Sequence, residues 1–189
     1  MKRLAILGST GSIGANTLAV VDRHCDRFQV VALSADRQVD RLFEQCSRYR
    51  PRFAAMADAA AADQLRRKVR DSGLDCEVLS GARGLEQIAA APEVDAVMAA
   101  IVGSAGLRSA LAAARAGKQL LLANKEALVM AGGLLMDAVA ASGAMLLPID
   151  SEHNAIFQAL PRDFDGSFPS AGVKRLWLTA SGGPFLRTA

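Results

Sequence analysis

The run Gly8-Ser9-Thr10-Gly11-Ser12-Ile13-Gly14 decides the fold of this sequence. It follows the apolar run Leu4-Ala5-Ile6-Leu7 and precedes a stretch with helical character. A glycine-rich turn between a strand and a helix lets backbone N–H groups approach a pyrophosphate at the positive end of the helix dipole. The spacing is G-x-x-G-x-x-G rather than G-x-G-x-x-G, so a plain tight turn is the alternative interpretation. In this position we expect a dinucleotide-binding turn.

Outward from this turn, short strand-like runs alternate with longer Ala-rich stretches. Runs such as Leu120-Leu121-Leu122 are apolar throughout, which is typical of strands buried on both faces of a parallel sheet. The alternation predicts an α/β fold with a Rossmann-like, doubly wound, mainly parallel sheet. Strands are predicted at 3–7, 29–33, 52–56, 77–79, 96–99, 119–122, 144–147 and 174–179, and helices at 13–23, 39–49, 59–71, 85–90, 107–116 and 126–141.

The composition of the chain changes after Asp150. Proline, glycine and aspartate become dense over residues 161–172, which indicates a loop or a crossover between domains. We expect a dinucleotide-binding domain over residues 1–149. Residues 150–189 are expected to form the first edge of a second, catalytic domain.

Composition excludes several classes of protein. With 51% hydrophobic and 22% charged residues, the chain is not of the disordered class. The net charge is +3, and the sequence contains no run of Lys and Arg that would follow a nucleic acid backbone. No apolar run is long enough for a signal peptide or a membrane span. The odd number of cysteines, without a C-x-x-C pair, favours a reducing compartment, the cytoplasm. We expect no nucleic acid or membrane partner.

The loop after the second predicted strand offers two kinds of ribose contact. Asp36 would accept a hydrogen bond from a ribose 2′-OH, which favours NAD, whereas Arg37 would accommodate a 2′-phosphate, which favours NADP. The chemistry of the pair leans slightly to NADP. A solvated loop with no ligand is the alternative.

Asn124-Lys125-Glu126 follows the sixth predicted strand at its carboxyl end, the edge at which open α/β sheets bind ligands. Helix capping is the alternative, with Asn124 as the N-cap and Glu126 in the first turn. Lys125 does not fit capping, because a cation in the first turn opposes the helix dipole. A nearby anionic ligand would explain its presence.

Asp150-Ser151-Glu152-His153 follows the seventh predicted strand. If the backbone stays extended, Asp150 and Glu152 point to the same side. Two such carboxylates repel unless a cation lies between them, and their hard oxygens suit Mg²⁺ or Mn²⁺. Surface exposure is the alternative for the carboxylates, and His153 is expected to be a neutral structural residue. Further on, Ser181-Gly182-Gly183-Pro184 is either a phosphate-holding loop or an ordinary turn.

Four runs occur in a fixed order: Gly8 to Gly14, Ala123 to Glu126, Leu147 to Gln158 and Ala180 to Phe185. Together they resemble the 1-deoxy-D-xylulose 5-phosphate reductoisomerase family of non-mevalonate isoprenoid biosynthesis. The resemblance implies an enzyme dependent on NADPH and a divalent metal. Such an enzyme isomerises the carbon skeleton of its phosphosugar substrate and then reduces the aldehyde to 2-C-methyl-D-erythritol 4-phosphate. A regulatory module that binds NADP without catalysis is the alternative.

The resemblance also implies roles for individual residues. Asp36 stands where the family commonly has Gly or Asn, so Arg37 carries the expected 2′-phosphate contact. The implied NADPH contacts are Thr10, Gly11, Ser12, Ile13, Asp36, Arg37, Gln38, Asn124 and Glu126. The implied substrate contacts are Lys125, Ser151, Glu152 and Ser181, the metal ligands are Asp150 and Glu152, and the catalytic set is Asp150, Glu152 and Lys125.

The family is homodimeric and has further parts after this region: a third metal carboxylate, a lid with a histidine, and a C-terminal helical domain. We therefore expect this chain to be the first part of a longer enzyme. We expect it to bind NADPH without turnover by itself.

Overall fold

The computed structural model describes residues 1–161, 164, 168 and 171–178 of the chain. The chain divides into two compact units, Met1–Leu147 and Pro148–Ala189. In chain order the elements are β1 (Lys2–Leu7), α1 (Ser12–Arg23), β2 (Phe28–Ala35), α2 (Val39–Tyr49), β3 (Phe53–Met56), α3 (Ala59–Asp71), β4 (Glu77–Ser80), α4 (Gly81–Ala90), β5 (Ala96–Ala99), the 3₁₀ turn η1 (Gly103–Gly106), α5 (Leu107–Arg115), β6 (Gln119–Leu122), α6 (Lys125–Ser142), β7 (Met145–Pro148) and α7 (Ser151–Ala159).

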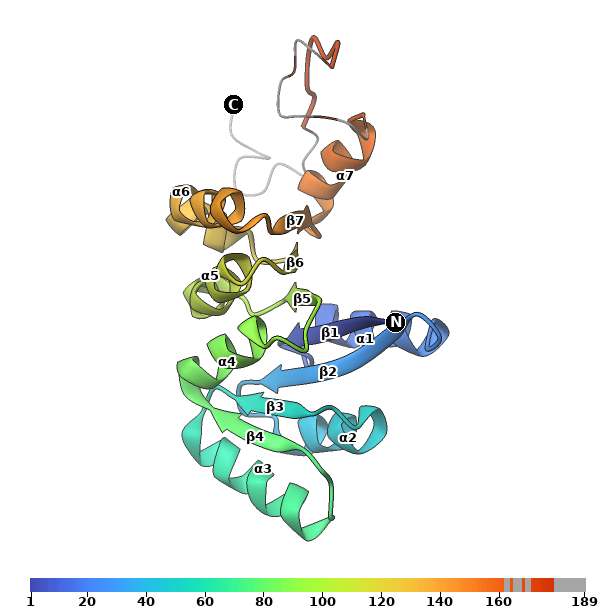
Figure 1. The fold of residues 1–189 in the computed structure, drawn as a ribbon, viewed down its shortest axis with the longest axis vertical. Helices are drawn as coiled ribbons and strands as arrows, with labels where there is room; N and C mark the ends of the chain where they lie inside the picture. Colours follow the sequence, from blue (N-terminus) through green and yellow to red (C-terminus); the bar gives the residue numbers. More distant parts are fainter. Residues whose placement is uncertain (162–163, 165–167, 169–170, 179–189) are drawn as a thin grey trace, which may run out of the picture. The chain divides into compact units, whose positions relative to one another are not determined.

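The strands of the described residues form one seven-stranded sheet in the order β4-β3-β2-β1-β5-β6-β7 (Figure 1). The pairings that link β4 through to β6 are all parallel. The chain first steps outward from β1 to β4, then returns to place β5 beside β1 and steps the other way. The predicted doubly wound, mainly parallel α/β sheet is confirmed.

This strand order puts the helices on both faces of the sheet. Right-handed crossovers place helices on opposite faces when the direction of stepping reverses. Accordingly, α2 packs against α3, whereas α4 packs against α5 and α5 against α6 (Figure 1). The direction reverses between β1 and β5, and ligands of such folds bind outside the carboxyl ends of the strands at that point.

Burial explains why the predicted strands are apolar throughout. Every residue of β3 and β5 is buried, because helices cover both faces of the sheet. Small side chains let the helices come close: Ala110, Ala113 and Ala114 of α5 are fully buried in the core. The core of the first unit therefore fixes the strand ends at which the candidate ligand residues lie.

Two predictions of local structure are wrong. Residues 174–178 form no strand, and Thr179 lies outside the described residues. A strand needs a neighbouring strand edge, and here this segment lines a hollow beside α7 instead. The other error is an omission: residues 151–159, for which no helix was predicted, form α7.

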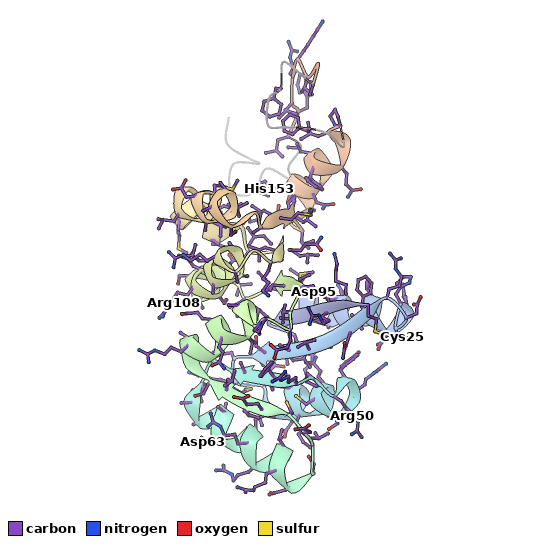
Figure 2. All side chains as sticks on the ribbon, viewed as in Figure 1. Cys25, Arg50, Asp63, Asp95, Arg108 and His153 are labelled. Atoms are coloured by element: carbon purple, nitrogen blue, oxygen red, sulfur yellow. The ribbon has the colours of Figure 1, made fainter. Side chains whose placement is uncertain are left out.

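Polar contacts join neighbouring strands at the edge of the sheet formed by their amino ends, the amino edge. Asp95, just before β5 (Figure 2), accepts hydrogen bonds from the Arg3 guanidinium at 2.6 and 3.1 Å and from the Arg3 backbone N–H at 2.8 Å. The Arg3 hydrogen bonds lower the pKa of the Asp95 carboxyl to about 2. On the same edge Lys118 donates to the carbonyls of Ala91 and Val94, at 2.8 and 2.7 Å. The Arg3 contacts join β1 to β5, and the Lys118 contacts join the start of β6 to the segment before β5, at the edge opposite the carboxyl ends of the strands.

The structure also bears on two expectations from the sequence, the state of the cysteines and the question of membrane spans. The cysteines Cys25, Cys46 and Cys76 are all free thiols. Among the described residues no helix has the length and apolar character that a bilayer span requires.

Candidate functional site

The carboxyl ends of four neighbouring strands carry the predicted cofactor residues of the first unit. In sheet order these strands are β2, β1, β5 and β6. Residues 36–38 follow β2, residues 8–14 follow β1, η1 follows β5, and residues 124–126 follow β6. Parallel pairing therefore brings segments from distant parts of the sequence to one edge.

The glycines of the turn after β1 are required by close backbone packing. Gly8 has a φ of 79°, and a Cβ there would lie 2.9 Å from the carbonyl oxygen of Ala100, just after β5. A Cβ on Gly14 would lie 2.4 Å from the carbonyl oxygen of Gly8. Neither site has room for a side chain. The turn therefore lies directly against the point where the strand order reverses, with α1 packed closely beneath it.

The start of α1 provides a suitable environment for an anion. Gly11 is the N-cap residue and donates its N–H to the carbonyl oxygen of Gly8 at 3.0 Å. Ser12 and Ile13 open the helix, whose first N–H groups have no partner within the helix. The first turn carries no acidic side chain, so nothing on it neutralises the positive end of the dipole. Thr10 is buried beside these groups.

The loop after β2 presents Arg37 to solvent. Its side chain is 78% exposed, and its Nε lies 3.6 Å from Oδ2 of Asp58. Asp58 is itself fixed, because its Oδ1 accepts from the N–H of Ala61 at 2.8 Å and caps α3. Asp36 is exposed, and Gln38 is the N-cap residue of α2. Asp58 was not singled out from the sequence, although an aspartate before an Ala-rich helix is a capping signal.

Asn124 is held in a way that helix capping does not explain. It occupies the N-cap position of α6, as predicted, but its side chain makes no capping bond. Instead Nδ2 donates to the carbonyls of Ile101 and Gly103 at 2.7 and 2.9 Å. The residue is 2% exposed, and its Oδ1 has no hydrogen-bond partner within the described part of the chain. A buried acceptor in this state fits a donor group supplied by a ligand.

The neighbours of Asn124 occupy the first turn of α6. Lys125 and Glu126 are both exposed there. The glycines of η1 are a further part of this edge that was not singled out from the sequence. A Cβ on Gly106 would lie 2.5 Å from Nδ2 of Asn124. Its signal was available, since a glycine-rich run, Gly103-Ser104-Ala105-Gly106, follows a predicted strand.

In the second unit the expectation of an extended backbone at Asp150 and Glu152 is wrong. Asp150 is the N-cap residue of α7, and Glu152 lies in the first turn of that helix. Residues two apart in a helix point in different directions. The alternation of side chains along a strand therefore does not apply to this pair.

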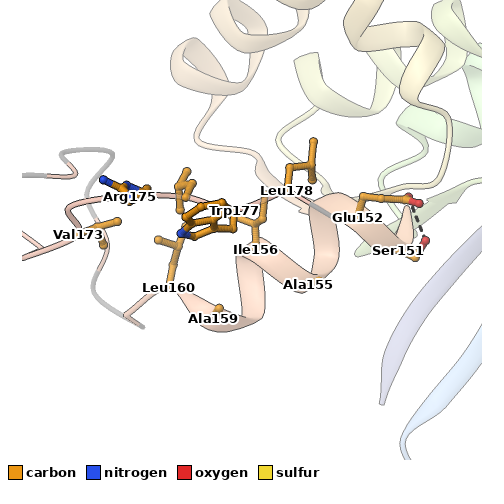
Figure 3. A pocket seen from close by; sticks show the side chains of 11 residues that line it. Ser151, Glu152, Ala155, Ile156, Ala159, Leu160, Val173, Arg175, Trp177 and Leu178 are labelled. Atoms are coloured by element: carbon orange, nitrogen blue, oxygen red, sulfur yellow. Dashed lines mark hydrogen bonds between the residues drawn. The ribbon is translucent and has the colours of Figure 1, made fainter. Parts of the chain in front are cut away.

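The polar side chains at the start of α7 interact with one another. His153 Nδ1 lies 2.9 Å from Oδ1 of Asp150, a contact in which the ring Nδ1–H donates to the carboxylate. Ser151 donates its hydroxyl to Oε2 of Glu152 at 2.9 Å (Figure 3). The Asp150 side chain is 14% exposed. Within residues 1–161, 164, 168 and 171–178, no three His, Cys, Asp or Glu side chains come together as a metal cage.

A hollow of about 470 Å³ adjoins Ser151 and Glu152 (Figure 3). It lies between α7 and residues 173–178, and most of its lining is apolar. Trp177 and Leu178, which line it, are themselves largely exposed. Ser181, the remaining predicted substrate contact, lies outside the described residues. The lining residues are Ser151, Glu152, Ala155, Ile156, Ala159, Leu160, Val173, Arg175, Leu176, Trp177 and Leu178.

Two protein-family models match this chain. A family model described as 1-deoxy-D-xylulose 5-phosphate reductoisomerase matches residues 4–132, and one described as the C-terminal domain of the same enzyme matches residues 146–189. The chain belongs to the 1-deoxy-D-xylulose 5-phosphate reductoisomerase family. The resemblance stated from the four sequence runs is confirmed.

Relatives that carry this family name are similar along the whole chain. The protein of Methylococcus capsulatus is 63% identical over 189 residues, which are 100% of this chain and 48% of the relative. The protein of Nitrosomonas eutropha is 60% identical over 185 residues, which are 98% of this chain and 45% of the relative. The chain thus spans about half the length of the curated relatives that it matches.

Solved reductoisomerase structures share the fold. A crystal structure of DOX-P reductoisomerase in complex with NADPH, fosmidomycin and magnesium is 49% identical with a TM-score of 0.93, over 100% of this chain and 47% of that chain. The reductoisomerase of Zymomonas mobilis in complex with NADPH is 45% identical with a TM-score of 0.89, over 100% of this chain and 48% of that chain. Both support the Rossmann-like assignment.

Proposed function

We propose that this chain is the NADPH-binding part and the first part of the metal site of a 1-deoxy-D-xylulose 5-phosphate reductoisomerase. The reaction is the isomerisation and NADPH-dependent reduction of 1-deoxy-D-xylulose 5-phosphate to 2-C-methyl-D-erythritol 4-phosphate. The observation that carries the proposal is the 63% identity to a reductoisomerase over all 189 residues. The glycine turn and the Asp150-Ser151-Glu152 run both lie within this match.

The ligand edge of the first unit fits NADPH. The turn after β1 has no space for a Cβ at Gly8 or Gly14, and the first turn of α1 carries no acid. A pyrophosphate would therefore approach the backbone N–H groups at the start of α1 without a carboxylate to repel it. Thr10, Gly11, Ser12 and Ile13 would bind the phosphates, Asp36, Arg37 and Gln38 would surround the 2′-phosphate, and Asn124 and Glu126 would complete the site. When bound, NADPH supplies the hydride that reduces the aldehyde carbon.

The start of α7 fits part of a magnesium or manganese site. Carboxylate oxygens such as those of Asp150 and Glu152 are the donors that Mg²⁺ and Mn²⁺ prefer. When bound, the metal supplies Lewis-acid polarisation of the substrate's carbonyl and hydroxyl oxygens. His153 orients the Asp150 carboxylate through their 2.9 Å contact. Ser151 orients Glu152 in the same way.

The remaining polar residues suit a phosphorylated sugar. Lys125 offers a cation, and Ser151 offers a hydroxyl beside Glu152. We assign substrate binding to Lys125, Ser151, Glu152 and Ser181, and the catalytic roles to Asp150, Glu152 and Lys125. The same proposal includes a homodimeric, cytoplasmic enzyme with a cofactor domain over 1–149 and a catalytic domain that begins at 150.

The proposal is tested with the full-length gene product. Purified protein, NADPH, Mg²⁺ or Mn²⁺ and 1-deoxy-D-xylulose 5-phosphate are combined, and NADPH absorbance and the methylerythritol phosphate product are followed together. We expect one NADPH consumed for each product formed, and no turnover after chelation of the metal. Residues 1–189 alone are expected to bind NADPH without consuming it. NADPH binding by the full-length protein without turnover under any metal would contradict the proposal and favour a regulatory module.

A further inference from the structure

The backbone of the glycine turn is held by two side chains from other elements, Gln45 of α2 and Ser34 of β2. The Gln45 amide contacts Ser9 at two points: Oε1 accepts from the Ser9 hydroxyl at 2.6 Å, and Nε2 donates to the Ser9 carbonyl at 3.0 Å. The Ser34 hydroxyl accepts from the Gly8 N–H at 3.0 Å, and its carbonyl accepts from the Ser9 N–H at 2.8 Å. Ser9 and Ser34 are both fully buried.

These bonds occupy the polar backbone groups of Gly8 and Ser9. The remaining carbonyl of the pair, that of Gly8, accepts from the Gly11 N–H at 3.0 Å. The N–H groups at the start of α1 have no such partner within their helix. The turn is thus divided into a part fixed by the protein and a part whose donors are available to a ligand.

Packing alone does not account for a glutamine at position 45. The buried residues of α2 are Val39, Leu42 and Cys46, which form an apolar face toward the sheet. An apolar side chain at position 45 would serve this packing equally well. The polar contacts that the Gln45 amide makes are both with Ser9 of the glycine turn.

We infer that Gln45 and Ser34 are positioning residues for the pyrophosphate of NADPH. By fixing Gly8 and Ser9, they hold the N–H donors at the start of α1 where the phosphates meet them. The inference rests on the proposed function, since it takes NADPH as the ligand. Neither residue belongs to the cofactor contacts implied by the family resemblance.

The test measures NADPH binding to the full-length gene product by fluorescence titration. Gln45→Met keeps the length of the side chain and removes both bonds to Ser9. We expect the Kd for NADPH to rise ~10-fold, as for the loss of one to two hydrogen bonds. Adenosine 2′-phosphate, which lacks the pyrophosphate, should bind the variant as it binds the unchanged protein. In turnover assays the KM for NADPH should rise, with kcat and the KM for the phosphosugar unchanged.

Two further variants complete the design. Ser47→Ala is the matched control, because Ser47 lies on α2 and its hydroxyl donates to the Phe43 carbonyl of the same helix at 3.0 Å; NADPH binding should stay unchanged. Ser34→Ala leaves the Gly8 N–H without its acceptor and should repeat the pattern of Gln45→Met. If Gln45→Met does not fold, the NADPH affinity of Ser34→Ala tests the inference instead.

Two results would overturn the inference. One is an unchanged affinity for NADPH in the folded variants. The other is an equal loss of affinity for NADPH and adenosine 2′-phosphate, which general loosening of the fold would produce. Failure of the unchanged protein to bind NADPH would instead refute the proposed function itself, so the two failures are distinguishable.

Discussion

The turn after β1 and the start of α7 both carry residues of the proposed reaction, yet they are held in different ways. Around the turn, Ser9 and Ser34 are fully buried, and the backbone at Gly14 leaves no room for a methyl group. Helix α7 has no buried residue. Its carboxylates are supported by near neighbours in sequence, His153 for Asp150 and Ser151 for Glu152.

The difference shows which part of the chemistry the first unit organises by itself. Contacts between elements distant in sequence fix the turn after β1, the proposed phosphate site, without a ligand, so we expect little ordering cost to remain for binding. At the start of α7, His153 contacts Asp150 and Ser151 contacts Glu152 within the same helix end, and we expect the metal to contribute to the final arrangement of these carboxylates. The predictions below separate these two modes of support, beginning with the largest effect.

The largest effect is expected from Asp150→Asn in the full-length enzyme. Loss of a metal-ligand charge should lower kcat/KM by more than ~100-fold, because even an outer partner of a ligand is worth about 10–100-fold. NADPH affinity should not change if the turn is organised independently. Steady-state kinetics and fluorescence titration measure the two quantities. Asp137→Asn, a change at an exposed residue of α6, is the control and should alter neither kcat/KM nor NADPH affinity. A parallel loss of NADPH binding in Asp150→Asn would show that the turn and the start of α7 are not organised independently.

Gly14→Ala should damage the turn directly. The new Cβ would lie 2.4 Å from the Gly8 carbonyl and 2.5 Å from Cα of Ser9. Such overpacking costs ~1–3 kcal/mol of unfolding free energy, and the displaced turn should also bind NADPH more weakly. Urea unfolding measures the first effect. Gly133→Ala on α6, where a Cβ meets nothing within 4 Å, is the matched control and should leave stability equal or higher. Equal stability of the two variants would refute the packing argument.

Arg37→Ala should alter cofactor choice with little effect on stability. Arg37 is exposed beside Asp58, and a charged contact to the 2′-phosphate is worth about 10-fold or more in Kd. We expect NADPH to bind at least ~10-fold more weakly and NADH to bind as before. Parallel titration of both cofactors measures this, with Arg41→Ala, an exposed residue of α2, as the control. An equal change for both cofactors would place the 2′-phosphate elsewhere.

The smallest effect concerns Asp95 at the amino edge. Its folded pKa of about 2 lies below the ordinary value of 3.8. The Arg3–Asp95 contact therefore stabilises the fold above about pH 4 and is lost as the pH falls toward 2. Both side chains are more than one-third exposed, so solvent screening keeps this contribution to the free energy of unfolding small.

Unfolding of Asp95→Asn at pH 6 and pH 3 tests this account. The variant should lose less stability between the two pH values than the unchanged protein does. Asp26→Asn, a change at an exposed carboxylate, should retain the full pH dependence. The same pH dependence in Asp95→Asn would assign the effect to other carboxylates.

The sequence predicts the first unit well because its signals are local. An apolar run such as Leu120-Leu121-Leu122 predicts a buried strand from its own residues. In the same way, the glycines between Gly8 and Gly14 predict a tight turn. At Asp150 the same approach fails, since a carboxylate after a strand can continue the strand or stand at the start of a helix, and here it occupies the N-cap position of α7 without a side-chain capping bond. The roles of Gln45 and Ser34 could not be predicted from the sequence for another reason. Their partners lie 36 and 26 residues away, and no local pattern records them.

The strand order has a consequence for how the chain folds during synthesis. β1 lies at the centre of the sheet, but one of its two neighbours, β5, is held to it by a contact across 92 residues, Arg3 with Asp95. At about 5–20 residues per second, the ribosome delivers that neighbour on the order of 5–20 s after β1. Until then β1 keeps one open edge, and Gly8 lacks the Ala100 backbone against which it packs. The turn after β1 is therefore among the first segments made, but its packing is completed only when β5 arrives.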